Sequence, residues 1–195
     1  MNLKPLTLIG QHVRLEPLAL SHLTGLQEAV ADGELWRLWY TAIPTPAAMA
    51  SEIQRRLDLQ SSGSMLPFAV IHLPDERMAG MTTYMHIDRS NRRLEIGSTW
   101  YRQSLQRTAL NTECKRMLLG HAFEELNCIA VEFRTHWHNT ASRRAIERLG
   151  AKLDGVLRSH QIAANGSLRD TCVYSIVASE WPAVKAHLDH ALQAH

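Results

Sequence analysis

Between residues 93 and 150 the sequence alternates between two hydrophobic periods, and this alternation restricts the fold more than any other feature. Residues 93–101 are rich in strand-forming side chains, and residues 129–135 carry apolar side chains at every second position, as strands do. Residues 112–126 and the segment from Asn139 to Gly150 place apolar side chains three and four positions apart, as helices do. A strand-helix-strand-helix order predicts a mixed α/β fold in which helices pack on a sheet.

The rest of the chain adds five strands and three helices. Strands are predicted over 12–17, 68–73, 78–87, 152–162 and 169–177, and the last two are joined by a turn at Asn165-Gly166. Helices are predicted over 21–31 and 46–59, with a last helix that carries Trp181, Val184, Leu188 and Leu192. We therefore expect a central, mixed, mostly antiparallel seven-stranded sheet with helices on both faces.

Length and composition favour one globular domain. The chain has 195 residues, of which 45% are hydrophobic and 21% are charged, and it contains no repeat or linker. We expect residues 1–195 to form a single domain.

No apolar run approaches the roughly 18 residues that span a membrane, and no signal peptide is evident, so we expect a cytoplasmic protein with no membrane partner. The three cysteines include no CxxC pair, which argues against a disulfide framework and a cysteine zinc site. The eleven histidines are scattered without an HExxH pattern, so they do not indicate a metal site.

Positive charge is concentrated in one part of the sequence. Residues 89–169 hold 14 Lys and Arg against seven Asp and Glu, a net charge of +7, whereas the remaining residues carry −5. The formal charge of the whole chain is therefore only +2. A basic segment favours an anionic partner, and a small polyanion fits this moderate excess as well as a nucleic acid does. A solvated basic face is the simpler alternative.

The turn over residues 106–112 joins the strand that ends near Tyr101 to the helix that starts near Asn111. A helix start presents unpaired backbone N–H groups and the positive end of the helix dipole, and here Arg107 and Thr108 add further donors. The turn can therefore hold a diphosphate. Every helix has such a start, so a helix that binds nothing here is the alternative.

The segment that follows the strand 129–135 carries a recognisable order of residues. Asn139 opens it, Ser142 follows three positions later, and Leu149-Gly150-Ala151 closes it. This order resembles motif B of the GNAT superfamily of acyl-CoA-dependent N-acyltransferases, and the serine is similar to that of the ribosomal-protein (Rim-type) N-acetyltransferase branch. The resemblance covers nearly the whole chain, with counterparts of that branch at 13–18, 93–97, 106–112 and 169–175.

The resemblance implies a GNAT-like fold in which strands splay apart near Tyr101 and Thr135 and acetyl-CoA lies across the sheet. The pyrophosphate would rest on residues 106–112, and backbone groups of residues 99–101 would pair with the pantetheine arm. The cofactor-binding residues implied by the resemblance are Thr99, Trp100, Tyr101, Gln106, Arg107, Thr108, Ala109, Leu110, Asn111, Thr112, Asn139, Ser142 and Arg143. No metal is implied.

The pyrophosphate turn departs from the family pattern at two positions. The family has a glycine, and then a glycine or alanine, where this chain has Ala109 and Asn111. Because glycine permits positive φ and close backbone approach, the change predicts either weaker cofactor binding or a backbone that does not need those angles. The small side chain of Ala109 favours the second explanation. One further residue between Gly97 and Gln106 predicts a bulge or a longer loop.

The resemblance also implies direct attack of an amine on the thioester. Such a reaction needs a group that removes the amine proton and a group that protonates the thiolate. Glu95 is the candidate base, acting through water, because a carboxylate near a cleft of low dielectric can have a raised pKa. An ordinary solvent-facing carboxylate is the alternative. Ser142 matches the family position that protonates the thiolate, and Asn139 the position that fixes the cofactor, although Asn139 also suits a plain helix N-cap.

The candidate substrate-binding residues are Trp36, Trp39 and Tyr40. With the hairpin turn at 163–168, they would line an acceptor pocket on the side opposite the cofactor. Trp36 and Trp39 are three positions apart, so burial in the core is the competing interpretation. We expect one of the two to lie in the core and the other in the pocket, and the sequence does not distinguish them.

The sequence therefore predicts transfer of an acetyl group from acetyl-CoA to a primary amine, either a protein N-terminal α-amine or a small-molecule amine. The alternative is a non-catalytic acyl-CoA sensor or regulatory module that retains the fold. A nucleic-acid binder ranks last, since no helix-turn-helix pattern supports it, and we expect no nucleic-acid partner. A homodimer that forms through an edge strand and the C-terminal helix is compatible with the predicted order of strands and helices.

Overall fold

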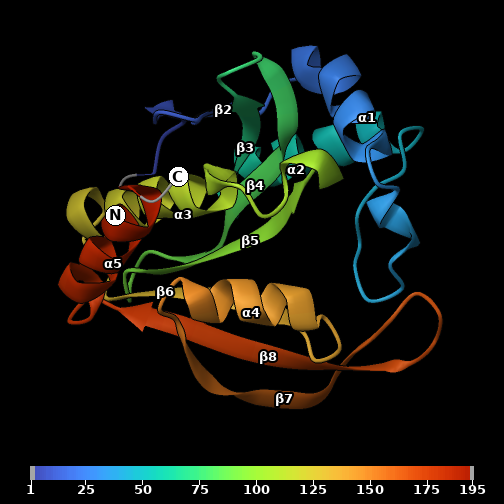
Figure 1. The fold of residues 1–195 in the computed structure, drawn as a ribbon. Helices are drawn as coiled ribbons and strands as arrows, with labels where there is room; N and C mark the ends of the chain where they lie inside the picture. Colours follow the sequence, from blue (N-terminus) through green and yellow to red (C-terminus); the bar gives the residue numbers. More distant parts are fainter. Residues whose placement is uncertain (1–2, 194–195) are drawn as a thin grey trace.

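The computed structural model describes residues 3–193 and contains an open eight-stranded sheet in the order β1-β2-β3-β4-β5-β6-β8-β7 (Figure 1). The strands are β1 (Leu8–Ile9), β2 (Val13–Pro17), β3 (Met65–His72), β4 (Arg77–Asp88), β5 (Arg93–Tyr101), β6 (Ala130–His136), β7 (Lys152–Ile162) and β8 (Leu168–Val177). The helices are α1 (Leu23–Ala31), α2 (Met49–Ser61), α3 (Ala109–Gly120), α4 (Thr140–Arg148) and α5 (Trp181–Gln193). A π-helical turn, His121–Glu125, continues α3.

The sheet has one strand more than the seven predicted, because β1 was not expected. β1 is two residues long and pairs with β2 only through Leu8 with Leu15 and Ile9 with Arg14. A strand of this length shows no alternation that a sequence pattern can detect. The seven predicted strands are all present, and six of the seven strand pairings are antiparallel, as expected of a mixed and mostly antiparallel sheet.

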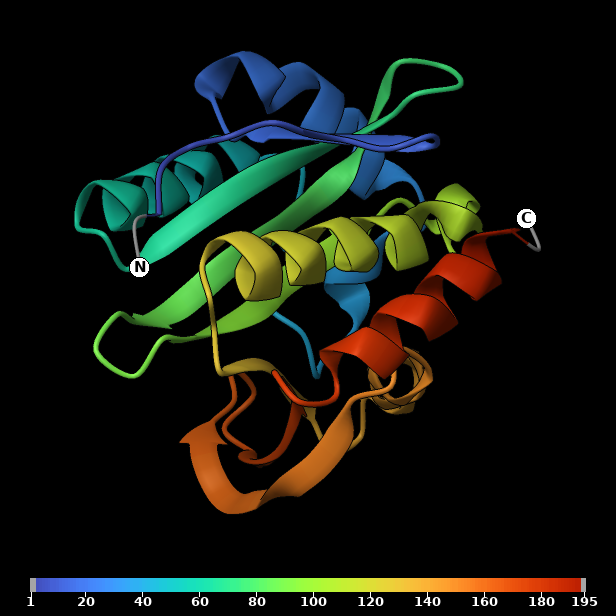
Figure 2. The same cartoon turned by 90° about the vertical axis from the view of Figure 1, so that its left-hand side faces the viewer.

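Helices cover both faces of the sheet, which confirms the prediction. On one face, side chains of α3, α4 and α5 such as Leu118, Ile146 and Trp181 share an apolar cluster with the sheet. On the other face, Leu26 of α1 and Ile53 of α2 pack in a second cluster. Figure 2 shows α3 and α5 in front of the sheet and α2 behind it. We refer to these as the α3–α5 face and the α1–α2 face.

Strands β5 and β6 run parallel and then separate. Their pairing covers Arg93 to Glu95 on β5 and Ala130 to Glu132 on β6, although both strands continue beyond these residues. The predicted splay is therefore present, and it opens a V between the two strands (Figure 1). Since α3 follows β5 and α4 follows β6, the ends of both arms of the V lead into the start of a helix.

The predicted extra length between Gly97 and Gln106 is present as a bulge in β5 and a short turn over 103–105. In the bulge, Ser98 has a positive φ of 47°, and the register between β4 and β5 shifts. The buried side chain of Arg56 fixes this bulge, since its guanidinium donates to the carbonyl oxygen of Ser98 at 3.2 Å and to Thr83 Oγ1 at 2.7 Å. Glu52 pairs with the same guanidinium at 2.7 Å and balances its charge.

The cysteines and the helix lengths agree with an ordinary globular interior. Cys114, Cys128 and Cys172 are all buried, in the positions expected of core residues. Within residues 3–193, no helix combines the length and the apolar character that crossing a membrane requires.

Candidate active site

Glu95 lies on β5 at the point where β5 and β6 separate. Its neighbours Leu94 and Ile96 pack into the cluster of the α3–α5 face, so the Glu95 side chain points to the α1–α2 face. Only 4% of Glu95 is exposed. The predicted base is therefore a buried carboxylate at the apex of the V, and the alternative of an ordinary solvent-facing carboxylate does not describe its surroundings.

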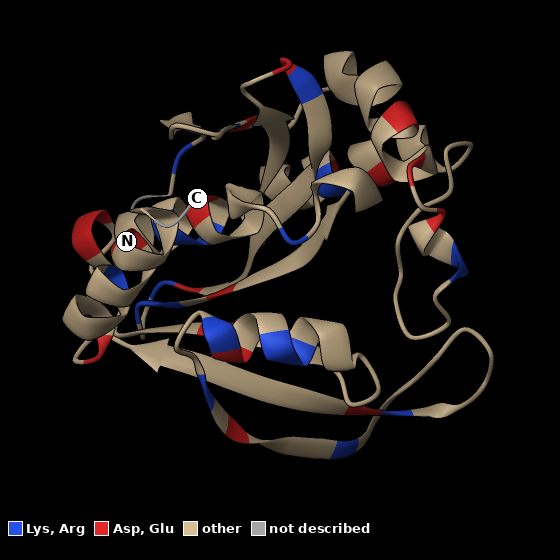
Figure 3. Ribbon diagram, viewed as in Figure 1, with Lys and Arg blue, Asp and Glu red and all other residues tan. Residues whose placement is uncertain are grey.

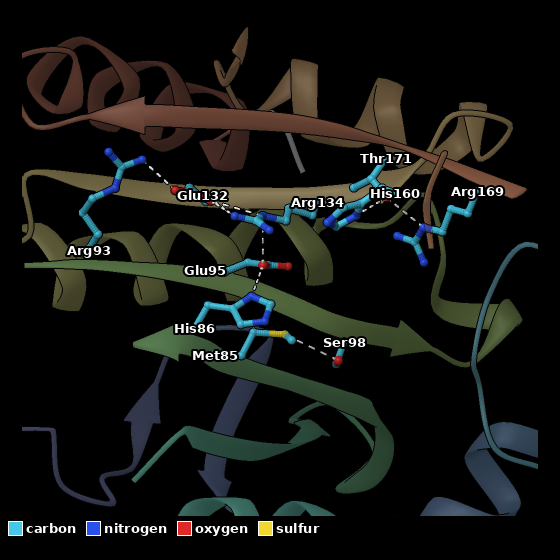
Figure 4. Close-up of polar contacts among 10 residues, drawn as sticks. All are labelled: Met85, His86, Arg93, Glu95, Ser98, Glu132, Arg134, His160, Arg169 and Thr171. Carbon is cyan, nitrogen blue, oxygen red and sulfur yellow. Dashed lines mark hydrogen bonds and ion pairs between the residues drawn. The ribbon is translucent and has the colours of Figure 1, made fainter. Parts of the chain in front are cut away.

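Two basic side chains hold the Glu95 carboxylate (Figure 4). The Nδ1 atom of His86, on β4, lies 2.7 Å from Glu95 Oε2, and the Nε atom of Arg134, on β6, lies 3.6 Å from the same oxygen. The imidazole of His86 is 60% exposed, whereas the carboxylate that it contacts is buried. The buried carboxylate of Glu95 is thus connected to solvent through the exposed imidazole of His86.

Burial raises the pKa of Glu95 above that of an ordinary glutamate. The hydrogen bond and charge of His86 and the charge of Arg134 act in the opposite direction, and the charge of Glu132, beside it on β6, raises the pKa further. The balance is a raised pKa, which suits a carboxylate that accepts a proton near neutral pH. A pocket of about 200 Å³ opens against this cluster, and its lining includes His86, Glu95 and Arg134.

The turn that leads into α3 contains a left-handed residue, and it is not at a position where the family has glycine. Arg107 has a φ of 64°, whereas Ala109 and Asn111 lie inside α3 with helical geometry. The two replaced glycines are therefore unnecessary for this backbone, as the small side chain of Ala109 suggested. Thr108 caps the helix, with Oγ1 accepting from the Leu110 N–H at 3.3 Å, and Gln106 donates to the Tyr101 carbonyl at 3.2 Å.

The donors at the start of α3 suit a phosphate group. Arg107 and Thr108 are exposed, and the first backbone N–H groups of α3 point out of its end. The side chains of Ala109, Leu110 and Thr112 are buried, so these three residues can offer a ligand only their backbone. Figure 3 shows further basic residues on α4, across the V from this helix start. The chemistry of this donor set therefore fits the diphosphate of coenzyme A.

The backbone of β5 beyond the bulge is also placed for ligand contact, but its side chains are not. Trp100 packs in the cluster of the α1–α2 face, and Tyr101 packs in the cluster of the α3–α5 face. Thr99 Oγ1 accepts from Lys115 Nζ at 2.9 Å and contacts Thr82 Oγ1 at 2.7 Å. Any cofactor contact along residues 99–101 therefore comes from main-chain groups, as the resemblance implies.

The start of α4 carries the motif B residues. Asn139 is the N-cap of this helix, because its Oδ1 accepts from the Ser142 N–H at 3.0 Å. Ser142 lies half-buried in the first turn. The guanidinium of Arg143 stacks 4.2 Å from the ring of Trp137 and donates to the hydroxyl of Tyr174 at 3.1 Å, so its contacts in this structure are with the protein.

Trp36 and Trp39, which the sequence could not assign individually to the core and to the pocket, have different surroundings. Trp36 packs against the cluster of the α1–α2 face, whereas Trp39 is 51% exposed. The ring of Trp39 meets that of His136 edge-on, with 5.1 Å between centroids, and the centroid of Tyr40 lies 6.3 Å from that of His136. Trp36 is thus the core residue of the pair, and Trp39 with Tyr40 lies at the end of β6.

Sequence reasoning missed several polar residues of this region. His86, Arg134, His136 and Arg169 come from three strands that lie on either side of the V, and no local motif marks them. Strand alternation could have placed Glu132, Arg134 and His136 on one face of β6. The contact of Arg134 with Glu95 depends on the sheet order, which the alternation does not determine.

Comparison with known proteins assigns the chain to a family. Residues 12–152 match the acetyltransferase (GNAT) domain family, and the chain belongs to that family. YdaF of Bacillus subtilis, named as a candidate ribosomal N-acetyltransferase, is 32% identical over 113 residues, which cover 58% of this chain and 61% of YdaF. The matched part of this chain thus spans less than two thirds of that relative.

Solved structures show the same fold. A GCN5-related N-acetyltransferase from Brucella melitensis is 33% identical, with a TM-score of 0.84 and coverage of 97% of this chain and 86% of that chain. RimJ of Mycobacterium smegmatis, solved in complex with CoA-disulfide, has a TM-score of 0.77 and covers 92% of this chain and 88% of that chain. RimJ is 23% identical to this chain, and at that level the likeness concerns the fold alone.

Proposed function

We propose that this chain is a single acyltransferase domain that transfers an acetyl group from acetyl-CoA to a primary amine by direct attack on the thioester. The observation that carries the proposal is the buried Glu95, with its raised pKa, at the apex of the V between β5 and β6. Membership of the GNAT family supports the reaction class, because this family uses acetyl-CoA.

In this proposal the α3–α5 face holds acetyl-CoA, which supplies the thioester. The N–H groups at the start of α3, with Arg107 and Thr108, hold the diphosphate. Main-chain groups of residues 99–101 align the pantetheine arm along the free edge of β5. Asn139 keeps the start of α4 in place by capping it, at 3.0 Å from the Ser142 N–H, and thereby positions Ser142 beside the V.

The proton transfers involve two side chains. As the amine nitrogen bonds to the acetyl carbon and the carbon-sulfur bond breaks, the proton lost by nitrogen passes through water to Glu95. The Ser142 hydroxyl donates a proton to the leaving sulfur and regains one from solvent. The acceptor enters from the α1–α2 face, where Trp39 and Tyr40 line the approach and Trp36 packs against the core cluster of that face. A protein N-terminal α-amine and a small-molecule amine are both candidate acceptors.

Release of free thiol from acetyl-CoA, measured against a panel of primary amines, tests the proposal. Turnover on at least one acceptor, with a mass increase equal to one acetyl group on that acceptor, is the expected result. If the protein binds acetyl-CoA tightly and releases no thiol with any amine, the alternative of a non-catalytic acyl-CoA sensor replaces the enzyme.

Replacement of Ser142 by alanine is expected to lower kcat by about tenfold or more, because thiolate departure loses its proton donor. Calorimetric titration should give an unchanged Kd for acetyl-CoA, since Asn139 caps the helix through the Ser142 backbone and not through its side chain. Ser51→Ala, at an exposed serine in the first turn of α2, is the matched control. An unchanged kcat in Ser142→Ala would remove this hydroxyl from the mechanism.

Replacement of His86 by glutamine should move the acid limb of the kcat/KM profile to higher pH. The charge and the 2.7 Å hydrogen bond of His86 lower the pKa of Glu95, so their loss raises that pKa, and the base is then protonated over a wider acidic range. The other charged groups around Glu95 remain, namely Glu132 and Arg134 on β6 and Arg169 on β8. His72→Gln, whose ring contacts Asp75 on the surface, should leave the profile unchanged. An acid limb that stays in place, or moves to lower pH, would contradict a positioning role for His86.

A further inference from the structure

Arg169 is a half-buried arginine without a carboxylate partner in the described part of the chain. It lies at the start of β8, and its Nε donates to Thr171 Oγ1 at 3.1 Å. Thr171 is buried and also contacts the ring of His160 at 3.1 Å, so the hydroxyl that orients Arg169 is itself held in place. The neighbouring carboxylate, Asp170, pairs with Arg158 at 2.6 Å.

The two arginines beside Glu95 and Glu132 are paired with carboxylates. Arg93 pairs with Glu132 at 2.6 Å, and Arg134 pairs with Glu132 at 2.9 Å and with Glu95 at 3.6 Å. Burial lowers the pKa of Arg169, but a guanidinium remains protonated at any physiological pH. A partly desolvated guanidinium that forms no ion pair is unfavourable, and a bound anion would compensate its charge.

Arg169 lies two residues before Thr171, which pairs across β6 and β8 with His136 at the end of β6. The positive charge of Arg169 interacts with the Glu95 carboxylate and lowers the pKa of His136. Figure 4 shows Glu95, Arg134, Thr171 and Arg169 along one side of β6 and β8. An amine held at Glu95 would therefore have the guanidinium of Arg169 within reach of a group on the same molecule.

His136 does not supply a competing positive charge. Its Nδ1 accepts the backbone N–H of His138 at 3.0 Å, which leaves the ring proton on Nε2. Burial and the charge of Arg169 lower the pKa of His136, so the ring is neutral at neutral pH. Only 3% of His136 is exposed, and Nε2 finds no hydrogen-bond partner among residues 3–193. The region thus combines a guanidinium that forms no ion pair among the described residues, that of Arg169, with an N–H donor that has no acceptor, that of His136.

We propose that the acceptor is a primary amine that carries an anionic group, a carboxylate or a phosphate, and that Arg169 binds this group while the amine lies at Glu95. This inference rests on the proposed acetyl transfer and adds the chemical class of the acceptor. The anion takes no part in bond formation. Its role is to orient the amine, so Arg169 is a specificity-determining residue of the acceptor site.

Matched acceptor pairs test the inference. The pairs are an amino acid and its carboxamide, an amino alcohol and its phosphate ester, and two peptides with aspartate or asparagine after the N-terminal residue. For at least one pair, the anionic member should have a kcat/KM about tenfold to a hundredfold higher, because a charged hydrogen bond has that effect on binding. The pair that responds distinguishes a carboxylate, a phosphate and a protein N-terminus.

Arg169→Gln should remove this preference by lowering kcat/KM for the anionic member and leaving that for the neutral member within about twofold. Arg158→Gln is the matched control, because Arg158 lies on the partner strand of the same hairpin and is already paired with Asp170. Arg158→Gln should retain the preference. Equal turnover of both members of every pair by the wild-type protein, or an unchanged preference in Arg169→Gln, would overturn the inference.

A binding measurement separates this inference from the proposed function. The N-acetylated form of each anionic compound is titrated calorimetrically into the protein with coenzyme A, and its Kd should be at least about tenfold weaker in Arg169→Gln than in the wild type. If no amine is acetylated but this difference is found, the proposed reaction fails and the anion site stands. If neutral amines are acetylated and neither the preference nor the binding difference is found, only the anion site fails.

Discussion

Replacement of Glu95 by glutamine is expected to lower kcat for amine acetylation by about 100-fold to 10,000-fold, the range that general-base catalysis supplies. Glutamine has the same shape but cannot accept a proton, so the amine would lose its proton only to bulk water. Steady-state thiol release at saturating acetyl-CoA measures the effect. The Kd for acetyl-CoA should stay within about twofold, because the diphosphate and pantetheine contacts proposed above lie on other residues.

The pH profile distinguishes a chemical role of Glu95 from a structural one. If Glu95 is the base, the residual activity of Glu95→Gln should lose the acid limb that the wild type shows, because the titrating group is gone. Glu16→Gln changes another strand glutamate, which pairs with Arg14 on β2 far from the V, and should leave both kcat and the acid limb in place. A Glu95→Gln variant with wild-type kcat would remove this residue from the mechanism.

Local patterns were sufficient for most of the fold. The Asn165-Gly166 turn predicted the β7–β8 hairpin, and that hairpin is present over 152–177. The strand-helix alternation predicted the two helices that follow the arms of the V. Two features were beyond such patterns: β1 is too short to show a period, and the exact form of the β5 bulge depends on Arg56, which reaches Ser98 from α2 at 3.2 Å.

The candidate site was predictable only where its residues belong to one segment. Asn139 and Ser142 lie three positions apart, and their hydrogen bond follows from helix capping. Glu95 was predicted to be the base, but its partners were not predicted, because His86 and Arg134 reach it from strands on either side. Arg169 was outside every motif. Its distinguishing property is that it forms no ion pair among the described residues. This depends on the register of β7 against β8, because Arg158 on β7 pairs with the neighbouring Asp170.

The turn over residues 106–112 lacks the two glycines of the family pattern. The missing glycines raised the question of weak cofactor binding, since glycine is needed where φ is positive. In this chain the positive φ falls on Arg107, and Ala109 and Asn111 are helical. The backbone of this turn therefore needs no glycine at positions 109 and 111.

The stability of this helix start depends on one buried carboxylate, Glu113. Its two oxygens accept the backbone N–H groups of Gln11, His12 and Val13 at 2.7, 2.8 and 2.9 Å, and only 6% of Glu113 is exposed. The chain wraps closely around this carboxylate, since a Cβ added at Gly10 would lie 2.4 Å from its Cδ atom. Glu113 thus joins the first turns of α3 to the start of β2, about one hundred residues earlier in the chain.

Glu113→Ala is expected to lower the free energy of unfolding by about 3–5 kcal/mol, because it leaves three backbone donors without their charged acceptor. Glu113→Gln should have a smaller effect, since the amide oxygen can still accept some of these hydrogen bonds. Urea denaturation followed by tryptophan fluorescence measures both. Glu125→Ala removes an exposed carboxylate that follows the same helix and should change stability by less than about 0.5 kcal/mol. A Glu113→Ala variant as stable as Glu125→Ala would show that solvent replaces the carboxylate, and that the anchor between β2 and α3 lies in the apolar contacts.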